Sequence, residues 1–326
     1  MKQIKNILIT GGAGYIGSHV AHDLVELGYN VFVFDNFTTG LKENVPKTAV
    51  TIEGDIRKIE DLQKLFTNEF DVVFHFAAFK AAGDSMNNPI NYAENNICGT
   101  LNIIKQMLLH NINFFVFSSS AAVYGEPRYL PIDEKHPKNP TNYYGFTKLI
   151  IEQNLEWFSK LNGIKYAALR YFNATGYDIK GRVKGKEKNP ANLSPIVMET
   201  AANIRESMQV FGNDYETVDG TCIRDFIHVN DLSSAHILAM DYLYKKNENI
   251  VVNLGTGTGH SVLEVIAAAE KVTNRKINYS VVNRRKGDPK ELVASCQLAK
   301  ELLGWEAKYS DLETIFTSMK PVYGIK

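Results

Sequence analysis

The sequence contains little cysteine, no excess charge and no long hydrophobic run. Its three cysteines, Cys98, Cys222 and Cys296, are odd in number and irregularly spaced, which argues against a disulfide framework and favours the reducing cytoplasm. The 36 basic and 36 acidic side chains cancel, whereas nucleic-acid-binding proteins usually carry a basic excess. No apolar stretch approaches the roughly 18 residues that span a bilayer. We therefore expect a cytoplasmic protein that binds neither nucleic acid nor membrane.

What is present is a regular alternation of strand-like and helix-like segments. In the helix-like segments apolar residues recur at intervals of three and four, which is the helical period. The strand-like runs are rich in β-branched and aromatic residues and occupy residues 4–10, 30–35, 49–55, 71–77, 113–119, 165–172 and 249–255. Continuous apolar strands are typical of a parallel sheet covered on both faces. The pattern therefore predicts an α/β protein with a doubly wound parallel sheet of the Rossmann type.

This alternation changes after residue 172. Residues 176–195 are rich in glycine, lysine, asparagine and proline, and residues 284–295 are rich in turn-forming residues, as is typical of loops. We expect a Rossmann-type domain, which binds the cofactor, and a smaller α/β lobe, which binds the substrate. The domain is predicted at 1–172 and 220–252, and the lobe at 173–219 and 253–326.

A glycine-rich loop joins the first predicted strand to the first predicted helix. The stretch TGGAGYIGSH contains Gly11, Gly14 and Gly17, and the next strand ends in Asp35. Such glycines let the backbone approach a pyrophosphate at the helix N-terminus. The carboxylate can accept hydrogen bonds from the adenosine ribose and would repel a 2′-phosphate. The pattern predicts a site for NAD rather than NADP; the alternative is that the glycines only form a turn and Asp35 only caps a strand.

Two further patterns receive structural interpretations. Gly255, Gly257 and Gly259 in NLGTGTGHS lack the spacing of the first loop, so we interpret them as a tight turn rather than a second nucleotide loop. His19 and His22 stand three residues apart, but no third ligand accompanies them. We therefore expect no metal, and we place both histidines on a solvated helix face.

The stretch NPTNYYGFTK contains two tyrosines, of which only the second has a lysine four residues later. If a helix begins near Tyr143, after the start signal at 140–142, Tyr144 and Lys148 share one face, whereas Tyr143 has Thr147 at that offset. Lowering a tyrosine pKa from about 10 to about 7 requires roughly 4 kcal/mol. An ammonium about 6 Å away supplies ~3 kcal/mol at an effective dielectric of about 20, and the positive nicotinamide ring of NAD⁺ adds to it. The spacing predicts Tyr144 as a general base assisted by Lys148; the alternative is a chance Tyr-x-x-x-Lys pair on the surface.

A serine-rich stretch, FSSSAAVYG, ends the fifth predicted strand. This is the edge of an open α/β sheet at which ligands bind. Ser120 can hydrogen-bond a substrate hydroxyl beside Tyr144 there; the alternative is a serine that only caps a turn.

Glycine loop, serine strand end and Tyr-x-x-x-Lys follow one another as in the extended short-chain dehydrogenase/reductase superfamily. More closely, nearly the whole chain resembles the UDP-glucose 4-epimerase family. The block that spans 211–232 is far more specific than any glycine loop. The matching stretches are TGGAGYIGSH, FDNFTTG, EGDIRK, HFAAFKA, NNICGTL, FSSSAAVYGEP, YYGFTK, RYFNATG, FGNDYETVDGTCIRDFIHVNDL, NLGTGTGHSVLEV and RRKGDPKELVAS.

The resemblance implies a role for each matching position. The catalytic set would be Ser120, Tyr144 and Lys148. NAD would be bound by Gly11, Gly14, Tyr15, Ile16, Gly17, Asp35, Asn36, Asp55, Ile56, Phe76, Ala77, Ala78, Lys80, Asn95, Ser118, Tyr144, Lys148 and Tyr171. The UDP-sugar would be bound by Lys80, Ser120, Tyr144, Asn173, Asn192, Leu193, Val210, Phe211, Arg224, Phe226, Val262, Arg285, Asp288 and Leu292.

Two of these residues, Arg224 and Arg285, come from distant segments and can clamp a diphosphate by bidentate contacts. The alternative for Arg224 is a structural ion pair with Asp225 or Asp231. The lysine-rich loop before Asn192 departs from the family pattern.

The implied reaction interconverts UDP-galactose and UDP-glucose in galactose metabolism. Tyr144 would take the proton of the sugar 4-hydroxyl while hydride moves from C4 to NAD⁺, and the 4-keto sugar would turn over and be reduced from its other face. This implies a resident cofactor and no net redox change. The resemblance also implies a homodimer.

Related activities fit the sequence less well or remain open. Sugar-nucleotide dehydratases and decarboxylases of the superfamily carry acids where this chain has Ala121 and Ala122. An NAD-dependent reductase would share Tyr144 and Lys148 but not the diphosphate blocks, and a non-catalytic NAD-binding regulator would be free to lose the triad. In the family a tyrosine at the position of Leu292 excludes N-acetyl sugars. Leucine is smaller, so a UDP-N-acetylglucosamine 4-epimerase or a dual-specificity enzyme is the alternative, unless Leu292 is only core packing.

Overall fold

The computed structural model describes residues 4–187, 190–285 and 287–326, and the chain forms two compact units. The first unit comprises Met1–Gly125, Lys138–Arg170 and Ser233–Val252. The second comprises Glu126–Pro137, Tyr171–Leu232 and Asn253–Lys326. No helix among the described residues is both long enough and apolar enough to cross a membrane.

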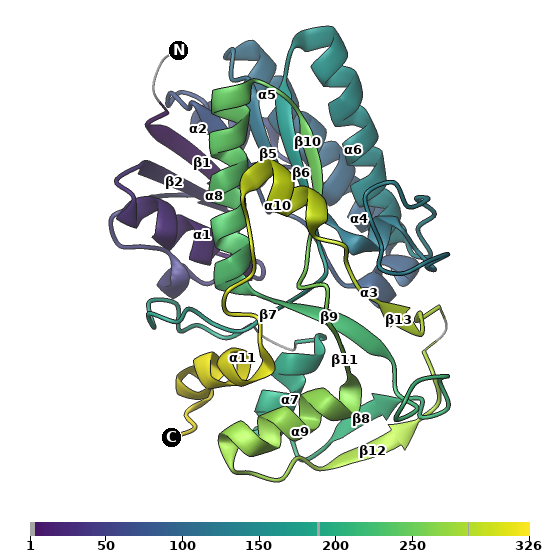
Figure 1. The fold of residues 1–326 in the computed structure, drawn as a ribbon. Coiled ribbons are helices and arrows are strands. Elements are labelled where there is room, and N and C mark those ends of the chain that lie inside the picture. The colour runs from purple at the N-terminus through teal and green to yellow at the C-terminus, as the bar shows by residue number, and fades with distance from the viewer. Residues whose placement is uncertain (1–3, 188–189, 286) are drawn as a thin grey trace. The chain divides into compact units, whose positions relative to one another are not determined.

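A seven-stranded sheet forms the centre of the first unit, in the order β10-β6-β5-β4-β1-β2-β3 (Figure 1). The strand pairs from β3 to β5 are parallel. The strands are β1 (Asn6–Thr10), β2 (Asn30–Asp35), β3 (Val50–Glu53), β4 (Val72–His75), β5 (Phe114–Ser120), β6 (Lys165–Tyr171) and β10 (Ile250–Leu254). Each lies within a predicted strand or within one residue of it. The order reverses between β1 and β4, as in a doubly wound sheet, so the predicted fold class is confirmed.

Helices cover both faces of this sheet. Figure 1 shows α1 (Tyr15–Glu26) and α8 (Val229–Lys246) on the near side, and α2 (Ile59–Leu65), α5 (Gly99–Leu109) and α6 (Tyr143–Asn162) on the far side. The apolar side chains of α2, α5 and α6 form one core with strand residues such as Phe115 and Phe117. Between β4 and α5 lie the short helices α3 (Ala82–Asn87) and α4 (Pro89–Tyr92) and a π-helical turn, Ala93–Cys98.

The second unit is a smaller α/β arrangement around β9 (Ile223–His228). β9 pairs with β7 (Asn173–Thr175) and β13 (Glu291–Leu292) in parallel and with β11 (Gly259–Ser261) antiparallel. β8 (Met208–Phe211) pairs in parallel with β12 (Tyr279–Val282). The helices are α7 (Leu193–Ala201), α9 (Val262–Thr273), α10 (Gln297–Leu303) and α11 (Leu312–Met319). The predicted loop at 176–195 contains the first residues of α7, and two of its residues, 188–189, lie outside the described chain.

The unit boundaries differ from the predicted domain boundaries at three segments. Residues 126–137, 171–172 and 220–232 are predicted in the Rossmann-type domain but belong to the second unit. Ile132 pairs with Ala294 there, and its N–H donates to Val293 O at 2.8 Å. The strand β9 lies within 220–232 and forms the centre of a separate sheet. Sequence periodicity identifies a strand but not the sheet that it joins, which explains the difference.

Helix α6 begins where the sequence predicts and lies close to the end of β5. The Asn142 side chain accepts a hydrogen bond from Gly145 N, which caps the first turn. A Cβ atom on Gly145 would lie 2.4 Å from the carbonyl oxygen of Ala122. Glycine at this position therefore lets the helix approach the backbone that follows Ser120.

We predict that Gly145→Ala destabilises the protein by about 2 kcal/mol, because overpacking against fixed backbone outweighs the gain in helix propensity. Equilibrium denaturant unfolding measures the change. The control is Gly83→Ala in α3, where a Cβ atom would meet nothing within 4 Å. Equal effects of the two substitutions would contradict the close contact.

Candidate active site

The predicted glycine loop forms a backbone cradle at the carboxyl end of β1. Gly11 has φ +71°, and a Cβ atom on it would lie 2.5 Å from Ala77 N at the end of β4. A Cβ atom on Gly17 would lie 2.4 Å from Gly11 O. Among the described residues, no side chain caps the first turn of α1. The helix N-terminus is thus open to an anion such as a pyrophosphate, and Tyr15 and Ile16 belong to this first turn.

Asp35 ends β2 beside this loop, as predicted. Its two carboxylate oxygens accept hydrogen bonds from Ala13 N at 3.0 Å and Phe37 N at 2.8 Å. Burial raises the pKa of Asp35, and these two bonds oppose the rise. A carboxylate held in this way has further lone pairs for the hydroxyls of a ribose.

The neighbouring acid, Asp55, is already partnered. Arg57 binds both of its carboxylate oxygens, at 2.9 and 2.6 Å, and Asn36 donates to it at 3.2 Å. The bonds to Arg57 hold the pKa of Asp55 well below its usual range although burial opposes them. Ile56 follows it and packs in the core.

The segment Phe76–Lys80, which contains Ala77 and Ala78, is anchored by an asparagine that sequence reasoning missed. Asn96 bonds both backbone groups of Phe79, at 2.8 and 2.9 Å, and Thr147 Oγ1 on α6 at 3.2 Å. Asn95, which was predicted, donates to Asn96 at 3.0 Å. The π-helical turn places both asparagines in the interior. The sequence signal was their adjacency, which did not indicate which one anchors the segment.

The structure brings Ser120, Tyr144 and Lys148 together at the end of β5. A side-chain hydrogen bond joins Tyr144 to Ser120. Lys148 Nζ donates to Ser118 O at 2.6 Å and to Ser118 Oγ at 3.2 Å, and it lies 5.8 Å from the centroid of the Tyr144 ring. The ring of Tyr143 pairs instead with Phe146. The predicted difference between the two tyrosines is therefore present in the structure.

Burial shifts the pKa values of Lys148 and Tyr144 away from those that the neighbouring charges alone would give. It lowers the pKa of Lys148 to about 7, which Glu152 partly opposes. It also raises the pKa of Tyr144, and only the hydrogen bond with Ser120 lowers it. The expected lowering of the tyrosine pKa is thus absent in the protein alone, because desolvation of the phenolate outweighs the nearby ammonium.

In the second unit, Arg224 on β9 does not form either predicted ion pair. It pairs with Asp288 instead and donates to Ile223 O at 2.6 Å and Pro289 O at 2.7 Å. Asp225 is bonded to the 255–257 turn and to Ala294 N. Asp231 accepts hydrogen bonds from the 308–310 segment. The pair therefore joins two predicted substrate residues.

The remaining predicted substrate residues of this unit lie mostly on its strands and at the starts of α7 and α9. Asn173 pairs with Phe226 across β7 and β9, and Leu292 pairs with Arg224 across β13 and β9. Val210 and Phe211 end β8, and the Arg285 guanidinium lies 3.8 Å from the Phe211 ring centroid. Asn192 and Leu193 begin α7, which packs on β8, and Val262 begins α9. Tyr171 ends β6.

A model of the NAD dependent epimerase/dehydratase family matches residues 7–255. The chain belongs to this family. A UDP-glucose 4-epimerase from Halalkalibacterium halodurans is 47% identical over 311 residues, which cover 95% of this chain and 92% of that protein. The solved structure of UDP-glucose 4-epimerase from Brucella ovis, in complex with NAD, has a TM-score of 0.95 at 42% identity and covers 99% of both chains. The UDP-Glc/GlcNAc 4-epimerase from Campylobacter jejuni has a TM-score of 0.86 at 40% identity, over 98% of this chain and 99% of that one.

The first unit fits the dinucleotide on which this family depends. The backbone cradle at Gly11 leaves no room for a side chain, and the Asp35 carboxylate lies beside it. Lys148 and Tyr144 lie on α6, and Lys148 bonds Ser118 near the carboxyl end of β5, where parallel sheets bind their ligands. NAD is the cofactor, and Lys148, Asn95 and the glycine loop are the residues that we expect to hold it.

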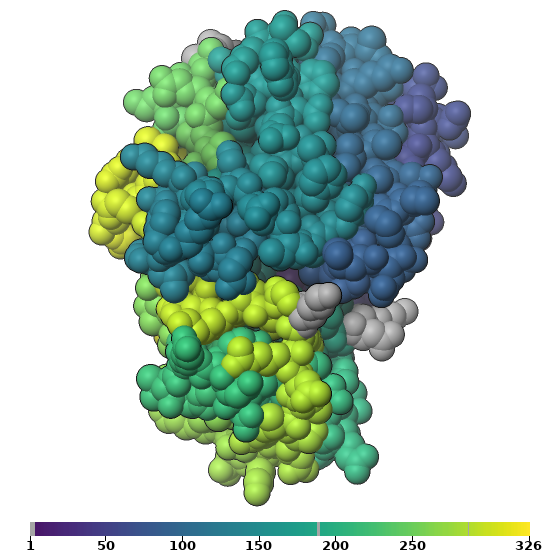
Figure 2. Space-filling model, turned by 90° about the vertical axis from the view of Figure 1, so that its right-hand side faces the viewer, coloured from purple at the N-terminus to yellow at the C-terminus, as the bar shows by residue number. Residues whose placement is uncertain are grey.

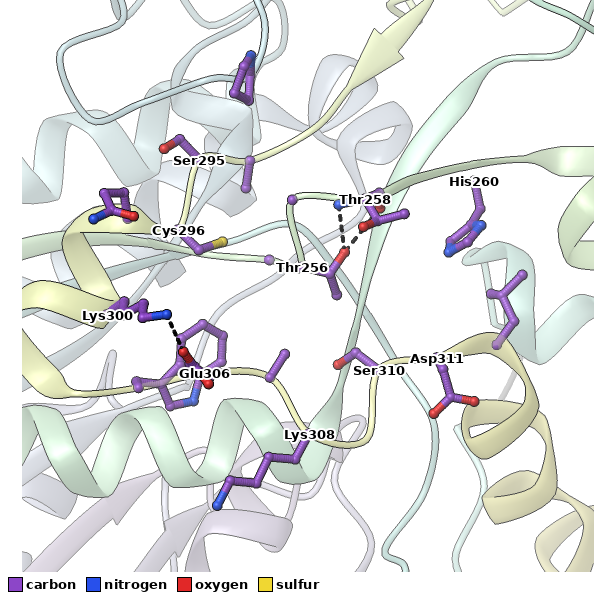
Figure 3. A pocket seen from close by; sticks show the side chains of 18 residues that line it. Thr256, Thr258, His260, Ser295, Cys296, Lys300, Glu306, Lys308, Ser310 and Asp311 are labelled. Atoms are coloured by element: carbon purple, nitrogen blue, oxygen red, sulfur yellow. Dashed lines mark hydrogen bonds and ion pairs between the residues drawn. The ribbon is translucent and has the colours of Figure 1, made fainter.

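The second glycine loop has a structural role in this family member. Thr256 N and Gly257 N donate to the Asp225 carboxylate at 2.8 and 3.0 Å, and Thr258 N donates to Thr256 Oγ1. These amides are therefore engaged, which fits the interpretation as a tight turn. Figure 3 shows the adjacent pocket of about 890 Å³, in which Lys300 pairs with Glu306. Its described lining includes none of the predicted site residues.

The histidine interpretation was wrong for His19. Its side chain is buried rather than solvated, and Nδ1 bonds Tyr15 O at 2.7 Å. The reason is that His19 lies on the inner face of α1, next to Val20 and Ala21. His22 bonds Asn44 O at 3.2 Å. In the part of the chain that the structure describes, no group of three His, Cys, Asp or Glu side chains can hold a metal.

We predict that Lys148→Met stabilises the cofactor-free protein by about 2 kcal/mol at pH 6, because a buried charge is replaced by an apolar chain of similar length. It should also lower turnover about 100-fold and weaken NAD retention. The folded-state pKa is about 7 and the ordinary value is 10.5. The buried ammonium therefore lowers the free energy of unfolding by its full amount below pH 7. This loss disappears as the pH rises towards 10.5.

Denaturant unfolding of both proteins between about pH 6 and pH 10 tests this prediction. The difference in unfolding free energy should shrink above pH 7. A difference that stays constant over this range would show that Lys148 does not lose its proton there.

Proposed function

We propose that the protein is a UDP-glucose 4-epimerase, which interconverts UDP-galactose and UDP-glucose through a transient 4-keto sugar with NAD bound. The observation that carries this proposal is the set of Ser120, Tyr144 and the buried Lys148 near the end of β5. It occurs in a chain whose relatives of similar length bear this name. Within this family such a set moves a proton to and from a sugar hydroxyl.

The chain's own residues divide the chemical work. Ser120 orients the sugar 4-hydroxyl, and Tyr144 removes its proton and later returns it. Lys148, held by Ser118, supplies the nearby positive charge that favours the phenolate. When bound, NAD⁺ accepts the hydride of C4 and gives it back. We assign the remaining cofactor contacts to the predicted glycine loop, Asp35, and the segment after β4.

The second unit supplies the groups that hold the UDP moiety. Arg224 and Arg285 carry the positive charge for the diphosphate. In the structure Arg224 is bound by Asp288 and Arg285 stacks on Phe211, so both guanidinium groups are oriented in advance. Asn173, Asn192, Leu193, Val210, Phe226 and Val262 are the further residues that we assign to the UDP-sugar.

Dehydration and decarboxylation would each require an acidic side chain at a position where this chain has alanine. Ala121 and Ala122, which follow Ser120 in a 3₁₀ turn, offer no carboxylate for elimination. A net reductase would have to release its cofactor in every turnover, whereas the reaction proposed here leaves NAD⁺ unchanged.

A homodimer in the cytoplasm remains our expectation from the family resemblance. Its support is an apolar surface on α6, where Phe146, Trp157 and Leu161 are exposed. Figure 2 views the face of the molecule that carries this helix, in teal. Cys98, Cys222 and Cys296 are free thiols, as suits a reducing compartment.

NMR of the sugar anomeric signals tests the proposed function. The purified protein is mixed with UDP-galactose, without added cofactor. Conversion to UDP-glucose is expected, because NAD is retained. No conversion, even after NAD⁺ is supplied, would overturn the proposal.

We predict that Tyr144→Phe lowers kcat about 1000-fold, because the base is removed, while the fold and the bound NAD remain. Circular dichroism, NAD released on denaturation and the NMR assay measure the three quantities. The control is Tyr143→Phe, since the Tyr143 ring contacts Phe146 and not Lys148. Near-normal activity of Tyr144→Phe would disprove the assignment of the base.

A second candidate activity is epimerisation of N-acetylated UDP-sugars. Leu292 is partly exposed on β13 and pairs with Arg224 on β9. A leucine here leaves more room beside the substrate residues than a tyrosine would. A similar protein from Campylobacter jejuni is described as a UDP-Glc/GlcNAc 4-epimerase.

Leu292→Tyr is predicted to lower kcat/KM for UDP-N-acetylgalactosamine at least about ten-fold relative to UDP-galactose, because the larger ring fills the space of the acetyl group. Leu292→Met, of similar volume, serves as the control. Parallel losses on both sugars would show that Leu292 contributes packing rather than selectivity.

A further inference from the structure

A buried ion pair joins the catalytic helix, α6, to β6 and has no part in the mechanism above. Glu152 lies on α6, one turn after Lys148, and Arg170 lies on β6. Only 6% and 2% of these residues are exposed. Arg170 binds both carboxylate oxygens of Glu152, through Nε at 2.9 Å and a terminal nitrogen at 2.6 Å. This bidentate geometry permits one orientation of the two groups.

Two buried hydroxyl groups complete the network. Ser119 Oγ donates to Glu152 Oε1 at 2.5 Å, and the other terminal nitrogen of Arg170 donates to the Tyr124 hydroxyl at 2.8 Å. Ser119 stands between Ser118 and Ser120 on β5. The network therefore attaches α6 to β5, whose serines lie beside the catalytic side chains, and to the neighbouring strand β6.

Stability alone does not explain such a pair. Removing two charges from water costs about as much as their attraction returns, and apolar residues of similar volume often stabilise a protein more. Apolar contacts, however, tolerate small displacements of a helix on a sheet, whereas bidentate hydrogen bonds do not. A fixed register of α6 is what the catalytic set requires.

We propose that the Glu152–Arg170 pair is a positioning element of the active site. It holds α6 in one register on β5 and β6, and so keeps Lys148 and Tyr144 opposite the serines of β5. This inference rests on the proposed function, in which those two residues carry the chemistry.

The charges of the pair also act on the catalytic groups. Burial lowers the pKa of Lys148 to about 7 and Glu152 opposes this. The pKa of Arg170 stays above its ordinary value, since the bonds to Glu152 outweigh the effect of burial. Other titratable groups nearby include Tyr124, His75, Tyr166 and Glu156. Burial and Lys148 lower the pKa of His75 to about 3, and burial, with Glu156 and Glu152, raises that of Tyr166 to about 12. Near neutral pH the activity therefore reports Tyr144 and Lys148.

The experiment compares Glu152→Gln, Arg170→Met, the double variant and wild type as holoenzymes on UDP-galactose. The control is Glu156→Gln on the same helix, where Glu156 pairs with Lys160 at 2.7 Å on the surface. The measurements are the thermal midpoint, NAD per chain, kcat, KM and the pH at half-maximal kcat.

We expect both single variants to lose stability and at least about ten-fold in kcat, because a small displacement of catalytic groups is costly, with KM within about three-fold. Glu152→Gln leaves a buried cation that favours the phenolate, so its acidic limb should move about one unit to lower pH. Arg170→Met leaves the buried Glu152 anion and should move the acidic limb of the pH profile to higher pH. The control should match wild type.

The double variant decides between positioning and plain structural support. Without an unpaired charge its thermal midpoint and pH profile should return to those of wild type, but kcat should stay at least about ten-fold lower because the bidentate bonds are gone. Recovery of kcat together with stability would overturn the inference, as would normal kcat in Glu152→Gln. The double variant remains informative if a single variant does not fold. Absence of epimerisation by wild type would overturn the proposed function instead.

Discussion

The burial of the Lys148 ammonium is the constraint on which the arrangement of the first unit depends. A charge in that position must find acceptors within the protein, and it finds them at Ser118 on β5. This requires α6 to cross closely over the end of β5, which Gly145 permits through its contact with Ala122. The same crossing places Tyr144 beside Ser120. One electrostatic requirement thus brings the catalytic helix close to the end of β5.

The second unit also contains a buried charged group that needs hydrogen-bond partners, in this case a carboxylate. Asp225 is fully buried on β9, and it accepts hydrogen bonds from Thr256, Gly257 and Ala294. These bonds attach two loops to the central strand. The neighbouring Arg224 is thereby presented from a rigid strand, although its partner Asp288 lies on a long connection. Rigid strands that carry charged groups lose little entropy when they bind an anionic substrate.

The packing that fixes the positions of the catalytic groups also disfavours their charged forms. Burial lowers the pKa of Lys148 to about 7 and raises that of Tyr144, because it disfavours the charged form of both groups. The positive nicotinamide ring of NAD⁺ would favour the phenolate of Tyr144 and so assist its role as the base.

The sequence by itself determined the seven strands of the sheet in the first unit, the glycine loop, the place of Asp35 at a strand end and the helical spacing of Tyr144 and Lys148. These features depend on local spacing, which decides what shares a helix face or ends a strand. Only the tertiary structure decided the unit to which β9 belongs, the burial of His19, the partner of Arg224, and the contacts of Asn96 and Arg170. Each of these depends on contacts between segments far apart in the chain. The sign of the Tyr144 pKa shift was decided in the same way, because desolvation is set by all the residues that pack around a group and not by its neighbours in sequence.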